Sequence, residues 1–342
     1  MEKLEFQKRI ALGKRLAQQS QAQIMSEISQ FTHTEHIDGP AYHPTPDRML
    51  YAAVFNLERG TYADACADFL LDCPDCRPVD LIFANELDDG CIRSGGGNTT
   101  RVLAERLGMH AVFGLEFVEL SAGAEEKGFH GNALLSRWPI VWSEVLRLPE
   151  AYNWYFDRQT RIGGRCAVFA RLDLGDREIG AVSVHLENRT DGIGRREQMQ
   201  AVLKHAARVF DGLPVIIGGD LNTNTFDGRD TDVIRLLADN PEICRSHLEE
   251  MTEREPLFEA ARIAGYAWQP ASAMTRRKPL PDGRTLELQL DWILYRGVQL
   301  ADSRIASTRA DDWTFTREGE ALKRFSGQQL SDHNVVWAKL YI

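Results

Sequence analysis

The segment IIGGDLNTNT (residues 216–225) is the most informative stretch of this chain. An apolar run of strand type, PVIIGG (214–219), leads directly into Asp220 and Asn222. Side chains two residues apart on a strand share a face, so these two are expected to point into one cavity. Strand ends are rigid and the loops beyond them are accessible, which is why such positions commonly build sites.

Other β-rich runs meet polar residues in the same way. LYAAVF (50–55), LIFA (81–84) and IGAVSVHL (179–186) end at them, whereas LDWILY (290–295) and VVWAKLYI (335–342) begin beside them. The polar side chains at these junctions are Asn56, Glu86, His185, Asp291, Asp332 and His333. Taken alone, each is better explained as a solvated strand end, a half-buried histidine or a turn residue. Carboxylates that converge need a cation or protons among them, so together they indicate a reactive site.

Helical patterns alternate with the strand-like runs. Examples are NTTRVLAERLG (98–108) and RREQMQAVLKHAARVF (195–210). This mixture predicts an α/β or α+β fold with large sheets. The composition agrees, because a chain of 342 residues with 43% hydrophobic and 26% charged residues is an ordinary globular protein. It excludes wholesale disorder, collagen-like repeats and a small disulfide scaffold.

The chain is expected to divide near residue 48. Residues 1–48 are predicted to form an N-terminal amphipathic helix over 3–30 and then a linker over 33–47, rich in Pro, His and Thr. Residues 49–342 are predicted to form one catalytic domain, because no Pro-, Gly- or Ser-rich linker interrupts them. The sequence does not predict an oligomeric state.

The charge balance bears on the partners. The 40 basic and 50 acidic residues give a net charge of −10. Such an excess opposes association with long polyanions, because each phosphate contact needs a local Lys or Arg. Nucleic acid is therefore a possible but disfavoured partner. The compact basic run TRRK (275–278) is explained either as a grip on a second anionic group or as a solvated charge run.

The compartment is inferred from the apolar runs, the N-terminal segment and the cysteines. No run approaches the ~18 apolar residues of a membrane span, and charges are scattered through the N-terminal segment, so a cytoplasmic protein is expected. Thiols are then the default state of the six cysteines. Cys73 and Cys76 form the one close pair, for which a metal, a disulfide and free thiols all stay open.

Seven motifs in a fixed order resemble the endonuclease/exonuclease/phosphatase (DNase I-like) superfamily. They are FNLERG (55–60), ANELDDG (84–90), GNALLSR (131–137), SVHLENRT (183–190), IIGGDLNTNT (216–225), LQLDWILY (288–295) and LSDHNVVWAKL (330–340). The resemblance implies a four-layered sandwich of two packed mixed β-sheets flanked by helices. Two departures are Asn334, where many members carry a small or apolar residue, and Asn85, where Gln is usual.

The same resemblance implies hydrolysis of a phosphoester substrate with Mg²⁺ or Mn²⁺. Carboxylate and carbonyl oxygens are the hard ligands that Mg²⁺ prefers. Glu86 would bind the metal, with Asn56 and Asp332 nearby. Asp220 would orient or deprotonate the attacking water, and Asn222 would hold that water or a phosphoryl oxygen.

Three further residues receive roles from the resemblance. His333, paired with Asp291, would stabilise the charged transition state. His185 is a candidate for protonating the leaving group or contacting the phosphate. Arg165 would bind the phosphate of the substrate, with Arg161 as the fallback, and a surface position on a strand edge is as probable for Arg165 as this role.

These inferences predict a phosphodiesterase that acts on a small or lipid-type phosphoester. The first alternative is a DNA endonuclease or exonuclease of the repair type. A member that binds a phosphorylated ligand without turnover is a third reading, which the presence of both Asp220 and His333 makes less favoured. The fold alone does not choose among these substrates.

Overall fold

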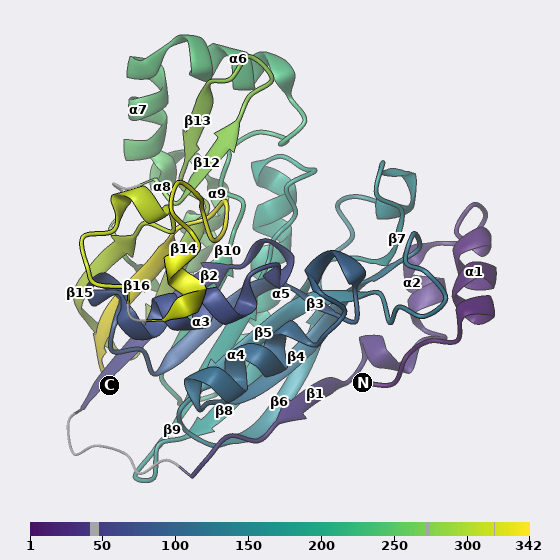
Figure 1. Ribbon diagram of the computed structural model, residues 1–342, viewed down its shortest axis with the longest axis horizontal. Helices are drawn as coiled ribbons and strands as arrows, with labels where there is room; N and C mark the ends of the chain where they lie inside the picture. The colour runs from purple at the N-terminus through teal and green to yellow at the C-terminus, as the bar shows by residue number, and fades with distance from the viewer. Residues whose placement is uncertain (42–47, 271–273, 318) are drawn as a thin grey trace.

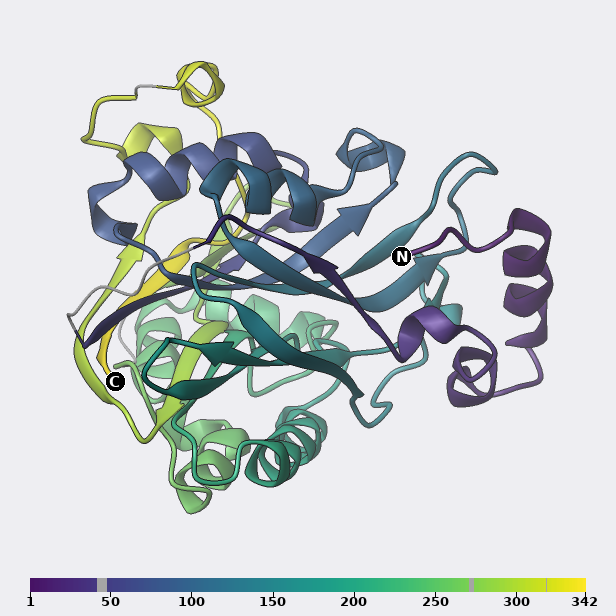
Figure 2. The same cartoon turned by 90° about the horizontal axis from the view of Figure 1, so that it is seen from below.

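The computed structural model describes residues 1–41, 48–270, 274–317 and 319–342. Two mixed β-sheets pack face to face, and helices cover their outer faces (Figures 1 and 2). This confirms the four-layered sandwich of the α/β class that the sequence predicts. His43, in the expected linker, lies outside the described residues.

The larger sheet has the order β1-β4-β5-β3-β2-β16-β15, and β7 pairs with β4. Strands β2 and β3 run parallel, so their carboxyl ends meet at one edge, while β5 and β16 are antiparallel to these neighbours. The bounds are β1 Thr34–Ile37, β2 Met49–Asn56, β3 Leu81–Asp89, β4 His110–Glu119, β5 Phe129–Ser136, β7 Arg161–Gly163, β15 Gln299–Ala306 and β16 Val335–Tyr341.

The second sheet has the order β11-β14-β10-β9-β8-β6. Here β9 and β10 are parallel, and β14 is antiparallel to β10 with Asp291 opposite Asp220. The bounds are β6 Ile140–Arg147, β8 Cys166–Asp173, β9 Glu178–Val184, β10 Val215–Asp220, β11 Ala267–Trp268 and β14 Asp291–Arg296.

Helices form the two outer layers. On the larger sheet lie α3 (Ala63–Asp72) and α4 (Thr99–Leu107), which bury an apolar face against it. On the second sheet lie α5 (Gly192–Val209) and α9 (Pro256–Ile263). Figure 2 shows these helices above and below the two sheets.

A small lobe follows β10. It contains α6 (Thr231–Asp239), α7 (Pro241–Glu249) and the hairpin of β12 (Arg276–Pro279) and β13 (Thr285–Leu288). These elements share their own apolar cluster, and they form the upper part of the view in Figure 1. The short helices α8 (Met251–Arg254) and α10 (Glu320–Lys323) and the 3-10 helix η6 (Ala310–Asp312) complete the described elements after residue 230.

The N-terminal segment differs from the prediction. The single helix expected over 3–30 is two helices, α1 (Phe6–Arg15) and α2 (Gln21–Met25). Ser20 starts the second one as its N-cap, because its hydroxyl accepts from Gln23 N while the Gln23 side chain accepts from Ser20 N. Residues 34–37, expected in a linker, are β1 and pair antiparallel with β4. The assignment of residues 49–342 to one catalytic domain stays a prediction.

The layer between the sheets is apolar over most of its length. Val54, Phe83 and Ile216 are fully buried there, and each stabilises the fold by roughly 1.5–3 kcal/mol. Gly218 faces Phe83, and a Cβ at this position would lie 2.3 Å from the ring atom Cδ2 of Phe83. The double glycine of β10 therefore lets an aromatic ring of the opposite sheet approach the strand backbone.

Candidate active site

The face that packs between the sheets changes from apolar to polar along each strand. On β2 it carries Leu50, Ala52, Val54 and then Asn56, and these positions alternate with residues of the outer face. The same change leads to Asn85 on β3, Glu116 on β4, Asn132 on β5, His185 after β9, Asp220 on β10 and Asp291 on β14. Because neighbouring strands reach this point at one end of the sandwich, the polar side chains meet there.

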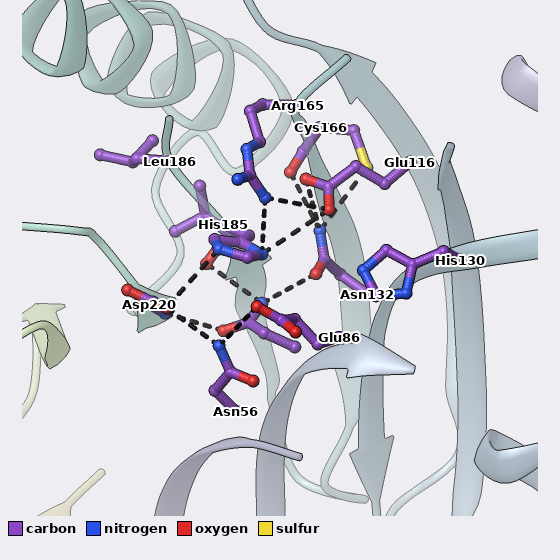
Figure 3. Close-up of polar contacts among 12 residues, drawn as sticks. Asn56, Glu86, Glu116, His130, Asn132, Arg165, Cys166, His185, Leu186 and Asp220 are labelled. Carbon is purple, nitrogen blue, oxygen red and sulfur yellow. Dashed lines mark hydrogen bonds and ion pairs between the residues drawn. The ribbon is translucent and has the colours of Figure 1, made fainter. Parts of the chain in front are cut away.

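Asn56 joins the two sheets at this end. Its Nδ2 donates to Glu86 Oε1 at 3.2 Å and to Asp220 Oδ2 at 2.9 Å, as Figure 3 shows. Glu86 lies at an irregularity of β3 and has φ 56°. A bulge of this kind re-aims a side chain, and a non-glycine residue in this conformation costs about 1–3 kcal/mol. Glu86 is half-buried and has no Lys, Arg or His within ion-pair distance among the described residues.

Asp220 is held from several sides. Its backbone N donates to Asn85 Oδ1 at 2.7 Å, and Asn222 N donates to its Oδ1 at 2.9 Å. Burial, together with the neighbouring carboxylate of Asp291, raises the pKa of Asp220 to about 6 against the opposing effect of His333. Asn222 has φ 47°, and its Nδ2 donates to Leu186 O at 3.0 Å. Asn222 therefore fixes the turn after β10, and its side-chain nitrogen is already bound to the backbone.

His333 and Asp291 form the contact that the resemblance implied. His333 Nδ1 lies 2.8 Å from Asp291 Oδ2, and its Nε2 faces Asp220 Oδ2 at 3.7 Å. Burial alone would lower the pKa of His333, but Asp291, Asp332 and Asp220 outweigh it and raise this pKa to about 9. The imidazole is therefore a cation at neutral pH, with Nδ1–H donated to Asp291.

Asp332 already has a cationic partner. Its side chain is 28% exposed and its Oδ2 accepts from Arg276 Nη2 at 2.7 Å. The Arg276 partner comes from β12, which is 56 residues away in the chain.

A second buried network surrounds His185 and Arg165 (Figure 3). Arg165 Nη1 lies 2.9 Å from His185 Nδ1 and 3.3 Å from Glu116 Oε2, and Arg165 Nε lies 3.3 Å from Glu187 Oε2. Arginine can only donate, so His185 Nδ1 must accept and the neutral ring carries its proton on Nε2. That Nε2 points to Asp220 Oδ2 at 3.5 Å. Burial is the larger cause and the charge of Arg165 the next, and together they lower the pKa of His185 well below its usual value. The ring is therefore neutral.

Arg165 is thus committed to protein partners. Its side chain is 5% exposed, and it stands against Trp154, whose Nε1 donates to Glu187 Oε2 at 2.8 Å. Arg161, the fallback, is also buried and pairs with Glu119 at 2.9 Å. Neither guanidinium is a free phosphate ligand in this conformation.

Sequence reasoning missed Glu116 and Asn132. Both are fully buried, and Asn132 Nδ2 lies 3.4 Å from Glu116 Oε1. The signal that could have found Glu116 is a carboxylate on the same strand face as Val112 and Gly114, inside an otherwise apolar run.

One group of side chains can also hold a metal ion. Ligand atoms of Asp220, Asp291 and His333 all lie within 4.8 Å of one another, and all three residues are buried. Asp291 Oδ1 is buried and has no hydrogen-bond partner in the part of the chain that the structure describes, so this oxygen is free to bind a cation or a proton.

The family follows from these motifs in this geometry. A model of the Endonuclease/Exonuclease/phosphatase family matches residues 53–333. The chain belongs to this family. Members of the endonuclease/exonuclease/phosphatase family are generally hydrolases that act on phosphoesters, and they typically depend on divalent metals. No curated protein sequence is similar enough to the chain to be matched.

Solved structures of the endonuclease/exonuclease/phosphatase family share the fold. A family protein from Beutenbergia cavernae is 18% identical, covers 86% of this chain and 72% of its own, and superposes with a TM-score of 0.53. The human Nocturnin catalytic domain with bound sulfate is 15% identical over 90% of this chain and 96% of its own, with a TM-score of 0.52. A humanised D. rerio TDP2 is 14% identical, covers 86% of this chain and 100% of its own, and superposes with a TM-score of 0.50.

No helix in the described ranges is both long and apolar enough to cross a bilayer.

Proposed function

We propose that this protein is a phosphodiesterase that needs Mg²⁺ or Mn²⁺ and acts on a small or lipid-type phosphoester. The observation that carries this proposal is the arrangement of Asp220 and His333. His333 Nε2 of a buried imidazolium and Oδ2 of the buried Asp220 carboxylate lie 3.7 Å apart, and Asp220 also accepts from Asn56, which contacts Glu86. One group can accept a proton while the other stabilises negative charge.

Glu86 fits the metal best. It is a half-buried carboxylate beside Asn56, without a basic ion-pair partner among the described side chains, and oxygen is the donor that Mg²⁺ prefers. Asn56 would add its amide oxygen only after its side chain turns, because Nδ2 faces Glu86 and Oδ1 accepts from Glu58 N at 3.1 Å. Asp332 would join only by sharing its carboxylate with Arg276. When bound, the metal would neutralise charge on the phosphoryl oxygens.

The remaining groups act on the water and the leaving group. The carboxylate of Asp220 would orient the water and accept its proton, since a pKa of about 6 leaves it ionised at pH 7 yet basic enough. His333 would donate to the charge that develops in the transition state. His185 would offer its Nε2–H to a phosphoryl or leaving-group oxygen, and Arg165 would be the residue that holds this tautomer.

A nuclease is the second candidate. TDP2 appears among the structural neighbours, one of them in a complex with a single-stranded DNA product. Against this stands the net charge of −10, because a protein that neutralises several phosphates needs several free cations. The cations nearest to the site are largely paired, since Arg165, Arg161 and Arg276 all contact carboxylates.

A substrate panel tests the proposal. We would measure turnover of bis-nitrophenyl phosphate, sphingomyelin, inositol phosphates, plasmid DNA and an abasic duplex with Mg²⁺, Mn²⁺ or EDTA. EDTA should abolish hydrolysis of a small diester, and either metal should restore it. Full activity after exhaustive chelation would refute the metal, and efficient DNA cleavage with a steep salt dependence would establish the nuclease. If none of these substrates is hydrolysed, the result favours the alternative that the protein binds a phosphorylated ligand without turnover.

The variant Glu86→Gln distinguishes the two candidate metal sites, one at Glu86 and the other at Asp220, Asp291 and His333. The variant should raise the metal concentration needed for half-maximal activity by ~10-fold or more, because an anionic ligand is lost. Glu259→Gln is the matched control, since Glu259 pairs with Arg262 on the surface of α9. If Asp291→Asn weakens metal binding and Glu86→Gln does not, the metal lies at Asp220, Asp291 and His333 instead.

A further inference from the structure

Lys278 is a cation beside the proposed catalytic centre that has no acidic partner. It is half-buried, and its Nζ donates to the backbone oxygen of Gly228 at 3.2 Å. It makes no ion pair with any Asp or Glu that the structure describes, whereas its neighbours Arg276 and Arg277 pair with Asp332 and Asp312. Burial of an ammonium without a counter-charge is unfavourable, so this position calls for an anion.

The strand β12 links Lys278 to the catalytic centre. Arg276 contacts Asp332 and forms an isolated bridge with His333, so the strand starts at the catalytic loop. Lys278 is two residues further and therefore lies on the same face, roughly 7 Å beyond Arg276 along the strand. Arg277 lies on the opposite face, where it reaches Asp312.

Two residues that follow β9, Asn188 and Arg189, are the further candidates for a site at Lys278. Gly228, which binds Lys278, also donates its N to Asn188 O at 2.8 Å, and a Cβ at Gly228 would lie 3.9 Å from Asn188 Cβ. Asn188 Oδ1 is buried and has no hydrogen-bond partner among the described residues, but it is an acceptor, so this side chain would bind an anion through its Nδ2. The next residue, Arg189, is 28% exposed at its side chain and is held by Asp157 at 3.4 Å. Burial lowers the pKa of Lys278, and Arg276 and Arg189 lower it further, as expected where three cations face one another.

We propose that Lys278, Asn188 and Arg189 form a second anion site, which binds another phosphoryl group of the substrate further along β12 than Arg276 and on the same face of that strand. The proposal rests on the proposed function and narrows its substrate to a small molecule with two phosphoryl groups. A phosphoryl group suits these side chains, because the ammonium offers three donors, the amide two and the guanidinium a fork. Arg276 and Arg189 already pair with Asp332 and Asp157, so the anion would chiefly neutralise Lys278, and Arg189 would join by sharing its guanidinium with Asp157.

The chemistry leaves two sources for the second phosphoryl group, a nucleotide and an inositol phosphate. We would measure binding by calorimetry in the presence of Mg²⁺, with a nucleoside 3′,5′-bisphosphate against the 5′-monophosphate and inositol 1,4-bisphosphate against inositol 1-phosphate. In one of these pairs the wild-type protein should bind the bisphosphate about tenfold more tightly, since one charge-assisted contact is gained. The pair that shows the preference identifies the source.

Variants assign the preference to the site. Lys278→Met should abolish it and leave the affinity for the monophosphate unchanged, and Asn188→Ala should reduce it. The control is Lys339→Met, which also removes one positive charge, but from β16, where Lys339 stands over the ring of Tyr51. Equal binding of both members of each pair by the wild-type protein would overturn the second anion site, as would a preference that survives in Lys278→Met.

The binding and turnover measurements test the second anion site and the phosphodiesterase activity independently. A preference for the bisphosphate that depends on Lys278, in a protein that hydrolyses no diester, would support the second anion site and refute the phosphodiesterase. Turnover of a diester without any such preference would do the reverse.

Discussion

The two ends of the layer between the sheets are built on the same strands and differ in chemistry. Toward one end β2, β3 and β10 carry Val54, Phe83 and Ile216, which are fully buried and apolar. Toward the other end the same faces carry Asn56, Asn85 and Asp220. The first end gains stability from burial, whereas the second desolvates polar groups and compensates with hydrogen bonds between the sheets. The difference shows where the fold is held and where it does chemistry.

The largest effect is expected at the apolar end. Phe83→Ala should destabilise the fold by about 3–5 kcal/mol, because a buried ring is lost and the rigid surroundings leave a cavity. Denaturant unfolding measures the change, and Phe156→Ala, at a side chain that is 71% exposed, should stay within about 0.5 kcal/mol. A loss below about 1 kcal/mol for Phe83→Ala would show that this end does not hold the fold.

At the polar end the effect should fall on rate instead. Asp220→Asn and His333→Ala should each lower kcat by ~10²-fold or more, since a proton acceptor or a stabilising cation is lost. Steady-state kinetics on the substrate found in the panel would show this, and circular dichroism would show that each variant keeps the fold. Near-normal kcat in either variant would contradict the role proposed for that residue.

A smaller effect is expected from Arg165→Met. His185 should exchange the Nε2–H tautomer for Nδ1–H, which can donate to Glu116 Oε2, now 3.6 Å away. The ¹⁵N shifts of the ring report this change, and kcat should fall about tenfold, the scale of one lost hydrogen bond to a charged group. Arg171→Met, on the half-exposed part of β8, is the control. An unchanged tautomer would remove the positioning role of Arg165.

The smallest effect concerns the one perturbed carboxylate at the apolar end. Burial raises the pKa of Asp80 to about 6, against the opposing effects of Tyr51 N and Arg137. A raised pKa favours the protonated folded state, so this contribution is present below pH ~4 and is lost as the pH rises through about 6. Between pH 5 and 7 the wild type should lose about 1 kcal/mol relative to Asp80→Asn. Parallel stability curves for the two proteins would contradict the shift.

Local pattern was enough for the fold and for much of the polar end. The alternation of two residues in each strand, and the motifs around Asp220 and His333, could be interpreted without coordinates. The contact between His333 and Asp291 was implied by the resemblance, and the structure shows it. The roles of these side chains stay proposals.

What the sequence did not predict depends on partners far away in the chain. The resemblance implied that Arg165 binds the phosphate of the substrate, but its guanidinium pairs with Glu116 and Glu187. These carboxylates come close to Arg165 only when the sheets form and pack together. Asp332 meets Arg276 only because the hairpin of β12 and β13 folds back over the catalytic loop. The pairing of β1 with β4 likewise joins residues about 80 positions apart, which no local periodicity encodes.

Asn85 has a consequence for motion. Its side chain belongs to the larger sheet, yet Oδ1 accepts from Asp220 N and Nδ2 donates to Val184 O, both in the second sheet. A third bond, to Asn132 Oδ1 at 3.0 Å, ties it to the neighbouring strand of its own sheet. Sliding of one sheet over the other would break these bonds inside a water-poor layer. Opening and closing around a substrate must then come from the surface loops and the hairpin of β12 and β13, and the amide hydrogens of Asp220 should exchange with solvent far more slowly than those of the hairpin.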